Sequence, residues 1–423
     1  MIKKIKNIAN TEDKKRLLSN FFSLSVLQGA NYILPLITLP YLVRVLGVEY
    51  FGLLAFATAT VMYFQILTDY GFNLTATREI SIHRDNKEKV IEIFSSVMTI
   101  KVILMFVSFF LLFILVFSFE KFSKDALVYF LTFGTVIGQV LFPVWFFQGM
   151  ERMKYITYLN ILSKVIFTIA IFVFVQEQSD YYLVPFLTSV GFLVAGIWSL
   201  YLVKKEFDVS FSFQKVETIK HYLVDGWHVF LSQFQISLFS SSNIIILGLF
   251  INNTAVGYYS AAERIMRAVA GLNVPVTGTI FPRISNLMKI NRTKAIFELR
   301  KILKVGGVIY TFVAMLIIIF AKEIIELIYS QNSSDSILLL QIMAIVPLTI
   351  FLNNIFGTQI MLNMNKEKEF FLVLFWGGIL NLLICSVLTY FYSFLGTTIA
   401  LLVVEVFIML YMYNYVKEVL YDK

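Results

Sequence analysis

Apolar residues form long, nearly continuous runs along this chain, and short polar stretches separate them. A helix of about 20 apolar residues crosses the hydrocarbon core of a bilayer, whereas a membrane β-strand needs about 10 residues of alternating polarity. The runs match the first pattern, and they predict about twelve transmembrane helices. The expected spans are 20–42, 53–73, 95–117, 127–147, 156–175, 182–203, 226–250, 256–282, 303–321, 337–362, 370–390 and 396–416.

The composition excludes a soluble protein. Hydrophobic residues make up 58% of the 423 positions and charged residues only 15%, which is too little charge to cover a surface in water. We therefore expect an all-α polytopic membrane protein. The single cysteine, Cys385, lies in an apolar run, so the chain offers no intramolecular disulfide, redox pair or Cys-rich metal site.

Basic residues indicate how the spans are oriented. When loops are assigned to alternating sides of the membrane, the side with the N-terminus carries 27 Lys and Arg and the other side carries four. Cytoplasmic loops carry the excess of positive charge, so both termini are predicted to be cytoplasmic. The net charge of +8 follows from this topology and does not indicate a nucleic-acid partner.

An internal repeat predicts two lobes. Gly52 aligns with Gly257 and Arg78 with Arg283, both at an offset of 205 residues. A repeat of six spans puts both halves in the same orientation, related by a pseudo-twofold axis along the membrane normal, with a cavity between two six-helix lobes. The predicted parts are a cytoplasmic basic N-terminal segment (1–19), an N-lobe (20–203), a cytoplasmic inter-lobe linker (204–225), a C-lobe (226–416) and a cytoplasmic tail (417–423).

Four bases fall inside the predicted spans. An ionised side chain at the bilayer centre costs at least about 2.5–3.5 kcal/mol, so such residues face a wet cavity or a partner. Arg264, Arg267 and Lys164 lie near the middle of their spans, and we expect them to line a cavity and bind an anion. Lys101 is a weaker candidate because its stem could reach the interface. Structural ion pairs between packed helices are the alternative for all four.

Acidic and amide side chains also occur within the spans. The acidic ones either bind a proton or cation or act as counter-charges to the bases, and Glu263 could pair with Arg267 four residues along its helix. The amides either contact glycan hydroxyls or join helices as interhelical hydrogen bonds. The acidic residues are Asp69, Glu263 and Glu405, and the amides are Gln28, Asn31, Gln233, Gln235 and Asn243.

No motif for enzymatic chemistry is present. The sequence contains no HExxH, GxxxxGK[ST], GxGxxG or DxD pattern, and its three histidines lack metal-ligand spacing. We therefore expect neither an enzyme nor a bound cofactor or metal, while coupling to H⁺ or Na⁺ stays open. The charged residues of the loop at 78–94 are expected to form a solvated face.

Several strings resemble a known family. LPYLVRVLGVEYFG, FPVWFFQGMERM, VGYYSAAERI and GTQIML are similar to segments of polysaccharide repeat-unit flippases of the Wzx type, in the superfamily that includes the multidrug (MATE) exporters and lipid II flippases. The resemblance extends from about residue 20 to 416. It implies a V-shaped, alternating-access transporter with a cationic lumen, which agrees in kind with Arg264, Arg267 and Lys164.

The resemblance also implies a function and a location. The expected cargo is an undecaprenyl-diphosphate-linked oligosaccharide, moved from the cytoplasmic to the outer leaflet of the bacterial cytoplasmic membrane for O-antigen or capsule synthesis. The expected partners are this cargo, membrane lipids and the polysaccharide polymerase machinery. A cation-coupled MATE-type exporter is the alternative with the same fold. A membrane-embedded glycosyl polymerase or ligase would need a catalytic surface outside the membrane, and the short outer loops disfavour it.

Overall fold

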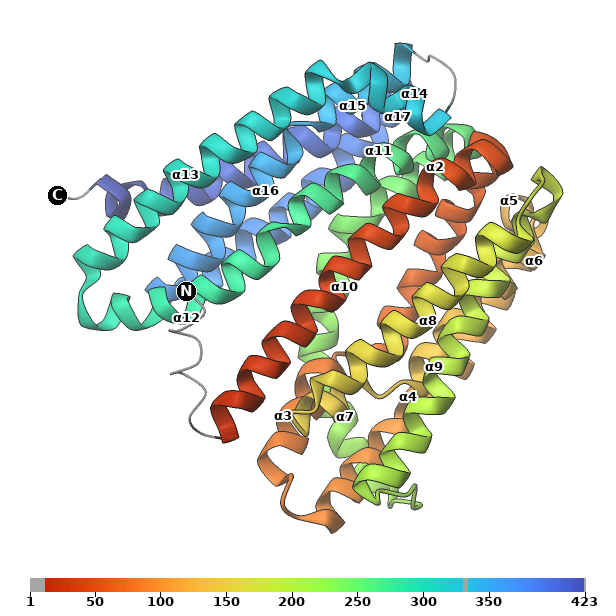
Figure 1. The fold of residues 1–423 in the computed structure, drawn as a ribbon, viewed down its shortest axis with the longest axis vertical. Coiled ribbons are helices and arrows are strands. Elements are labelled where there is room, and N and C mark those ends of the chain that lie inside the picture. Colours follow the sequence, from red (N-terminus) through yellow and green to blue (C-terminus); the bar gives the residue numbers. More distant parts are fainter. Residues whose placement is uncertain (1–11, 330–333, 422–423) are drawn as a thin grey trace. The chain divides into compact units, whose positions relative to one another are not determined.

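The computed structural model describes residues 12–329 and 334–421, and this part of the chain consists of helices joined by short turns (Figure 1). Residues 1–11 of the predicted basic N-terminal segment and residues 422–423 of the predicted tail lie outside the described residues. No strand occurs in either described range. The prediction of an all-α polytopic membrane protein is confirmed.

The helices follow one another with few long connections. In the first half of the chain they are α2 (Glu12–Asp69), α3 (Phe72–His83), α4 (Lys87–Ser118), α5 (Glu120–Ser123), α6 (Ala126–Leu141), α7 (Val144–Gly149), α8 (Met153–Phe174), η1 (Gln178–Tyr182) and α9 (Leu183–Phe207). In the second half they are α10 (Val216–Phe250), α11 (Asn253–Gly271), α12 (Asn273–Ile290), α13 (Arg292–Ile319), α14 (Ala321–Tyr329), α15 (Ser334–Met343), α16 (Val346–Asn354), η2 (Ile355–Met361), η3 (Leu362–Met364) and α17 (Glu367–Tyr421).

Two helices are long enough to hold two predicted spans each. α2 has 58 residues and α17 has 55, and each is interrupted by one residue with non-helical backbone angles. In α2 that residue is Gly47, with φ 77°, a conformation that glycine adopts without steric cost. In α17 it is Ser393, with φ 52°. Both interruptions fall in the loops predicted between paired spans.

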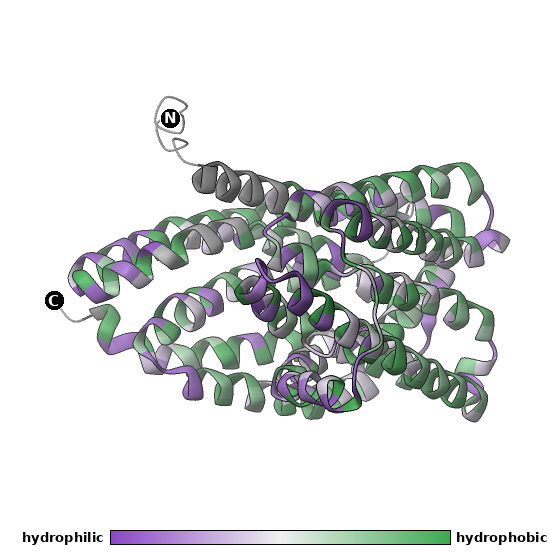
Figure 2. Ribbon diagram, turned by 90° about the horizontal axis from the view of Figure 1, so that it is seen from below, coloured by the Kyte–Doolittle hydropathy of each residue, from purple (hydrophilic) through white to green (hydrophobic). Residues whose placement is uncertain are grey.

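Apolar side chains cover much of the outer surface of the helices. Among the described residues, eight helical segments are long and apolar enough to cross a membrane. On α4, Phe106, Phe110 and Phe117 are each more than 60% exposed, as expected of a helix that faces lipid rather than water. Figure 2 shows hydrophobic residues along most of the helical length and hydrophilic residues mainly at loops and helix ends.

The chain divides into two compact units. Unit 1 comprises the chain up to Leu34 together with Ala57–Phe234, and unit 2 comprises Pro35–Phe56 together with Gln235–Lys423. This division differs from the predicted lobes, because 35–56 groups with the second half of the chain and 216–234 with the first. The assignment of the lobes as two six-helix halves stays a prediction.

Aromatic residues build the core of unit 1. Trp145, Phe146 and Phe147 on α7 are fully buried and pack with Phe94 on α4, at ring-centroid distances of 5.7–5.9 Å for Phe94 with Trp145 and Phe146. Such pairs add about 0.5–1.5 kcal/mol beyond the area they bury. The apolar FPVWFF string therefore anchors the short helix α7 against α4.

A reciprocal glycine contact joins α2 to α11 within unit 2. A Cβ atom at Gly52 would lie 1.8 Å from the carbonyl oxygen of Asn253, and a Cβ at Gly257 would lie 2.2 Å from the carbonyl oxygen of Val48. Each pair, 48 with 253 and 52 with 257, differs by the same 205 residues as the predicted repeat. Val48 contacts Gly257, and their repeat counterparts, Asn253 and Gly52, contact each other in the same way. The contact therefore has local twofold symmetry. This geometry supports the predicted duplication.

Candidate functional site

A cation with a neutral partner lies on α8 in unit 1. The half-buried Lys164 donates a hydrogen bond to Oδ1 of Asn31 on α2, and Nδ2 of Asn31 donates to Oε1 of Gln28 at 3.2 Å. Within the described part of the chain, no carboxylate oxygen lies within 4.0 Å of the Lys164 ammonium. An amide oxygen leaves the positive charge uncompensated, so this cluster can bind an anion. We call Lys164, Asn31 and Gln28 the Lys164 cluster.

Lys101 and Asp69 form a buried ion pair in the same unit. Lys101 is 2% exposed, and its Nζ lies 3.2 Å from Oδ1 of Asp69, whose Oδ2 accepts a hydrogen bond from Asn73 at 2.9 Å. In this conformation the Lys101 side chain is almost fully enclosed by protein. The geometry therefore favours the structural alternative, an ion pair between α4 and α2 in which Asp69 is the counter-charge, and the anion contact of Lys101 stays a prediction.

Unit 2 contains a cavity of about 240 Å³ lined by two glutamates and one arginine. Glu263 is 8% exposed and accepts a hydrogen bond from Nη2 of Arg267 at 2.8 Å. Glu405 is 7% exposed, and its Oε2 accepts from Nδ2 of Asn353 at 2.7 Å. The pairing of Arg267 with Glu263 along one helix, which the sequence spacing allowed, is present. This cavity thus has two carboxylates to one guanidinium and is not the strongly cationic site expected around Arg267.

Arg264 has a different environment from Arg267. Its guanidinium carbon lies 4.8 Å from the ring centroid of Phe51 on α2, in a cation–π contact. Among the described residues, no carboxylate oxygen lies within 4.0 Å of its guanidinium. The ring faces one side of the group and supplies no full negative charge. Arg264 therefore has no direct ion-pair partner among the described residues, although the carboxylate of Glu263 acts on its charge from a greater distance, and it does not line the same cavity as Arg267.

Asn243 belongs to a buried network that joins three helices. It is 2% exposed, its Nδ2 donates to the Tyr259 hydroxyl at 3.2 Å, and its Oδ1 accepts from Nδ2 of Asn381 at 2.9 Å. Asn381 also donates to Oγ of Ser242 at 3.1 Å. One N–H and one lone pair of the Asn243 amide are thus bonded to neighbouring helices. This network favours the interhelical alternative for Asn243, and its glycan contact stays a prediction.

The two glutamines of α10 have a different exposure from Asn243. Gln233 is exposed and Gln235 is half-buried. Their proposed role as glycan contacts stays a prediction, as it does for Gln28 and Asn31.

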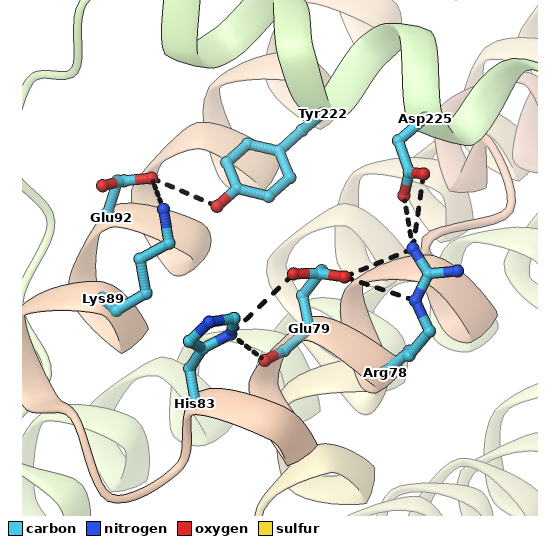
Figure 3. Close-up of polar contacts among 7 residues, drawn as sticks. All are labelled: Arg78, Glu79, His83, Lys89, Glu92, Tyr222 and Asp225. Carbon is cyan, nitrogen blue, oxygen red and sulfur yellow. Dashed lines mark hydrogen bonds and ion pairs between the residues drawn. The ribbon is translucent and has the colours of Figure 1, made fainter.

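A polar cluster missed by the sequence interpretation links α10 to α3 and α4 (Figure 3). Nη2 of Arg78 lies 3.0 and 3.3 Å from the two carboxylate oxygens of Asp225, and the Tyr222 hydroxyl donates to Glu92 at 3.1 Å. The expected solvated face at 78–94 is thus partly engaged with a helix about 130–147 residues further along the chain. Such a separation leaves no periodic signal in the sequence, so only the fold could reveal these partners.

Similar links occur at other positions in the predicted cytoplasmic loops. Arg283, the repeat counterpart of Arg78, lies 2.6 and 2.9 Å from the carboxylate oxygens of Glu298. Lys87 binds Asp208, and this ammonium holds the pKa of the Asp208 carboxyl below its usual value. The loops with excess positive charge are therefore tied to neighbouring helices by ion pairs.

Comparisons with known proteins place this geometry in a family of membrane transporters. The chain matches the family model "Polysaccharide biosynthesis protein" over residues 17–288. It is 35% identical, over 96% of its length and 98% of the relative's, to a protein of Escherichia coli (strain K12) named "Putative O-antigen transporter". The chain belongs to this polysaccharide biosynthesis family.

Solved structures show the same fold. The lipid II flippase MurJ in an inward closed conformation matches with a TM-score of 0.73 and 14% identity over 95% of this chain and 87% of MurJ. An inward-facing multidrug resistance MATE family transporter of the MOP superfamily matches with a TM-score of 0.65 and 14% identity, over 91% of this chain and 95% of that one. The family match and the O-antigen transporter relative confirm the predicted resemblance to polysaccharide repeat-unit flippases, and the solved structures show that the fold is shared with MurJ and a MATE transporter.

Proposed function

We propose that this protein is a flippase that moves lipid-linked polysaccharide units across a membrane. Family membership and the transporter relative support this assignment, and so does the fold shared with a lipid II flippase. The finer proposal is that the cargo is an undecaprenyl-diphosphate-linked oligosaccharide, carried from the cytoplasmic to the outer leaflet of the bacterial cytoplasmic membrane.

The observation that carries the proposal is the uncompensated charge of Lys164. A diphosphate cannot cross about 30 Å of hydrocarbon unaided, because desolvating its charges is too costly. Lys164 sits within a membrane helix with an amide as its partner, beside a second amide. The ammonium would bind a phosphate oxygen, and the amides of Asn31 and Gln28 would bind phosphate or sugar hydroxyls. The lipid tail would stay in the bilayer.

The test is transport in proteoliposomes with a fluorescent undecaprenyl-diphosphate-linked oligosaccharide. Lys164→Gln should reduce the flipping rate at least tenfold, since it removes the charge but keeps a hydrogen-bond donor, and Lys164→Arg should retain part of it. Lys154→Gln, at the start of the same helix, is the matched control and should flip normally. A wild-type rate for Lys164→Gln would remove Lys164 from the mechanism.

The second candidate function is a cation-coupled exporter. It is favoured by one observation, the cavity in unit 2 where Glu263 and Glu405 outnumber Arg267. An exporter of this kind would move a cationic dye against its gradient, and Glu405→Gln would stop that movement. Dye export by the wild type, together with no flipping of the lipid-linked oligosaccharide, would favour this function over the flippase.

The proposal extends to topology and to partners. We propose that both termini lie in the cytoplasm, and the excess of basic residues in the loops on the side of the N-terminus supports this. A reporter that fluoresces only in the cytoplasm should therefore be bright when it is fused after residue 423. A polysaccharide polymerase would act on the exported units, and co-purification of that enzyme with the tagged chain tests this partnership.

A further inference from the structure

An apolar groove in unit 2 lies between α12 and α13, next to the end of α11 and the side of α16. Its volume is about 460 Å³, which is larger than that of the cavity at Arg267. It does not include any residue of the sites described above. It is lined by Val269, Leu272, Asn273, Ile280, Lys301, Ile302, Val305, Gly306, Ile309, Tyr310, Val313 and Phe351.

Packed rings and a glycine form the floor of this groove. The rings of Tyr310 and Phe351 stack with centroids 5.0 Å apart. A Cβ atom at Gly306 would lie 2.2 Å from the Phe351 ring, so only a glycine lets this ring close against α13. The rim is open, because Val305 is 51% exposed and Ile309 is 54% exposed. The result is a smooth hydrocarbon surface that a flexible chain can enter from the side.

Positive charge lies at one end of the groove. Lys301 is exposed and is the charged residue among those that line it. The segment 283–304 contains seven bases and one acid, Glu298, and Arg283 already binds both oxygens of that acid. This end of the groove therefore attracts anions.

The groove has the depth of one leaflet. From Lys301 to Val313 α13 rises about 18 Å, at about 1.5 Å per residue. Half of the hydrocarbon core of a bilayer is about 15 Å. A lipid whose phosphate is bound at Lys301 could lay one acyl chain along the groove and end near the bilayer midplane. A polyprenyl chain of many isoprene units would extend well beyond it.

We infer that this groove is a binding site for an anionic phospholipid of the leaflet on the Lys301 side, with the lipid phosphate at Lys301 and one acyl chain on the floor formed by Gly306, Tyr310 and Phe351. Basic pockets between transmembrane helices on the cytoplasmic side are known as sites for anionic head groups. The bound lipid would fill apolar surface between α12 and α13 that no described side chain covers. This inference does not depend on what the protein transports.

The experiment is native mass spectrometry of the delipidated full chain in detergent, titrated with dioleoyl phosphatidylglycerol or with dioleoyl phosphatidylcholine. We expect the first molecule of phosphatidylglycerol to bind more tightly than any further molecules of the same lipid. Lys301→Gln should weaken that site about fivefold, from the attraction of a single basic residue near an anionic surface, and leave phosphatidylcholine binding unchanged. Ile309→Trp should fill the groove and weaken the binding of both lipids.

Two substitutions on the same helix are matched controls. Lys304→Gln removes a neighbouring charge and Val308→Trp adds bulk at an exposed position, and neither residue lines the groove. Equal losses for Lys301→Gln and Lys304→Gln would show a diffuse electrostatic effect and overturn the site. Unchanged binding to Ile309→Trp would also overturn it.

A competitor and a mapping experiment complete the test. Displacement of the tight lipid by undecaprenyl phosphate at a much lower concentration would show that the occupant is a cargo tail, and it would overturn the phospholipid assignment. Should Ile309→Trp fail to fold, a photoactivatable phosphatidylglycerol bound to the wild type decides the matter. Its cross-links should map to α13 between Lys301 and Val313, and cross-links confined to other helices would contradict the inference.

Discussion

The close approach of α2 and α11 makes Gly257→Ala a sharp test of the fold. The new Cβ would lie 2.2 Å from the carbonyl oxygen of Val48 and 2.7 Å from its Cγ1, whereas ordinary contacts begin near 3.4 Å. The side chain of Val48 could rotate, but its backbone oxygen cannot move without the helix. The two helices must therefore separate by about 1 Å, a type of overpacking that costs about 1–3 kcal/mol.

The backbone contact places the cost at the upper end of that range. Alanine regains about 1 kcal/mol of helix propensity over glycine, so the net destabilisation is about 2 kcal/mol. A unit of this size loses about 2–4 °C of Tm per kcal/mol. Gly257→Ala should therefore lower the Tm of the purified protein by about 4–8 °C, measured by intrinsic fluorescence in detergent.

Two further variants complete the test. Gly307→Ala, on α13, is the matched control, because a Cβ there meets nothing within 4 Å, and it should raise the Tm slightly through helix propensity. Gly52→Ala should resemble Gly257→Ala, and the double variant should lose less than the sum, since one separation of the helices accommodates both methyl groups. A Tm for Gly257→Ala at or above that of the wild type would refute the reciprocal contact.

Three further predictions concern buried charge, the polar cluster of α10 and the driving force. Asp69→Ala should destabilise the protein by about 3–5 kcal/mol, because it leaves the Lys101 ammonium buried without its partner, and adding Lys101→Met should recover most of the loss. Equal melting curves for Asp69→Ala and the wild type would contradict the ion pair. If the ion pair between Arg78 and Asp225 orients α10, Arg78→Asp or Asp225→Arg alone should reduce transport, and the double variant should restore it. A double variant that transports no faster than either single variant would rule out this role of the ion pair. A membrane potential of 100 mV, negative inside, favours outward movement of two negative charges by roughly 4.6 kcal/mol. Collapsing the potential at a fixed pH gradient should therefore slow flipping in proteoliposomes, and an unchanged rate would exclude this driving force.

Sequence patterns located the helices better than the polar contacts. Runs of about 20 apolar residues are a local property, and all twelve predicted spans fall on helices. The repeat offset of 205 residues also came from local strings. The kink residues Gly47 and Ser393 lie where loops were expected between paired spans.

The candidate site was only partly predictable. The sequence indicated that Lys164 lies within the membrane, but its partners Asn31 and Gln28 come from a helix more than 130 residues away. Likewise, Arg264 and Arg267 appear equivalent at a helical spacing of three, yet one stacks on Phe51 and the other binds Glu263. No sequence pattern pointed to Asn353, Asn381 or Tyr259 as partners of buried polar groups.

The sequence by itself determined that this protein is a bundle of membrane helices, because hydrophobic length decides whether a helix prefers lipid to water, and that preference needs no knowledge of neighbours. Only the tertiary structure decided which intramembrane charges have an ion-pair partner and which do not. The energy of a buried charge depends on groups within a few ångströms of it, and here packing between distant segments brings those groups together.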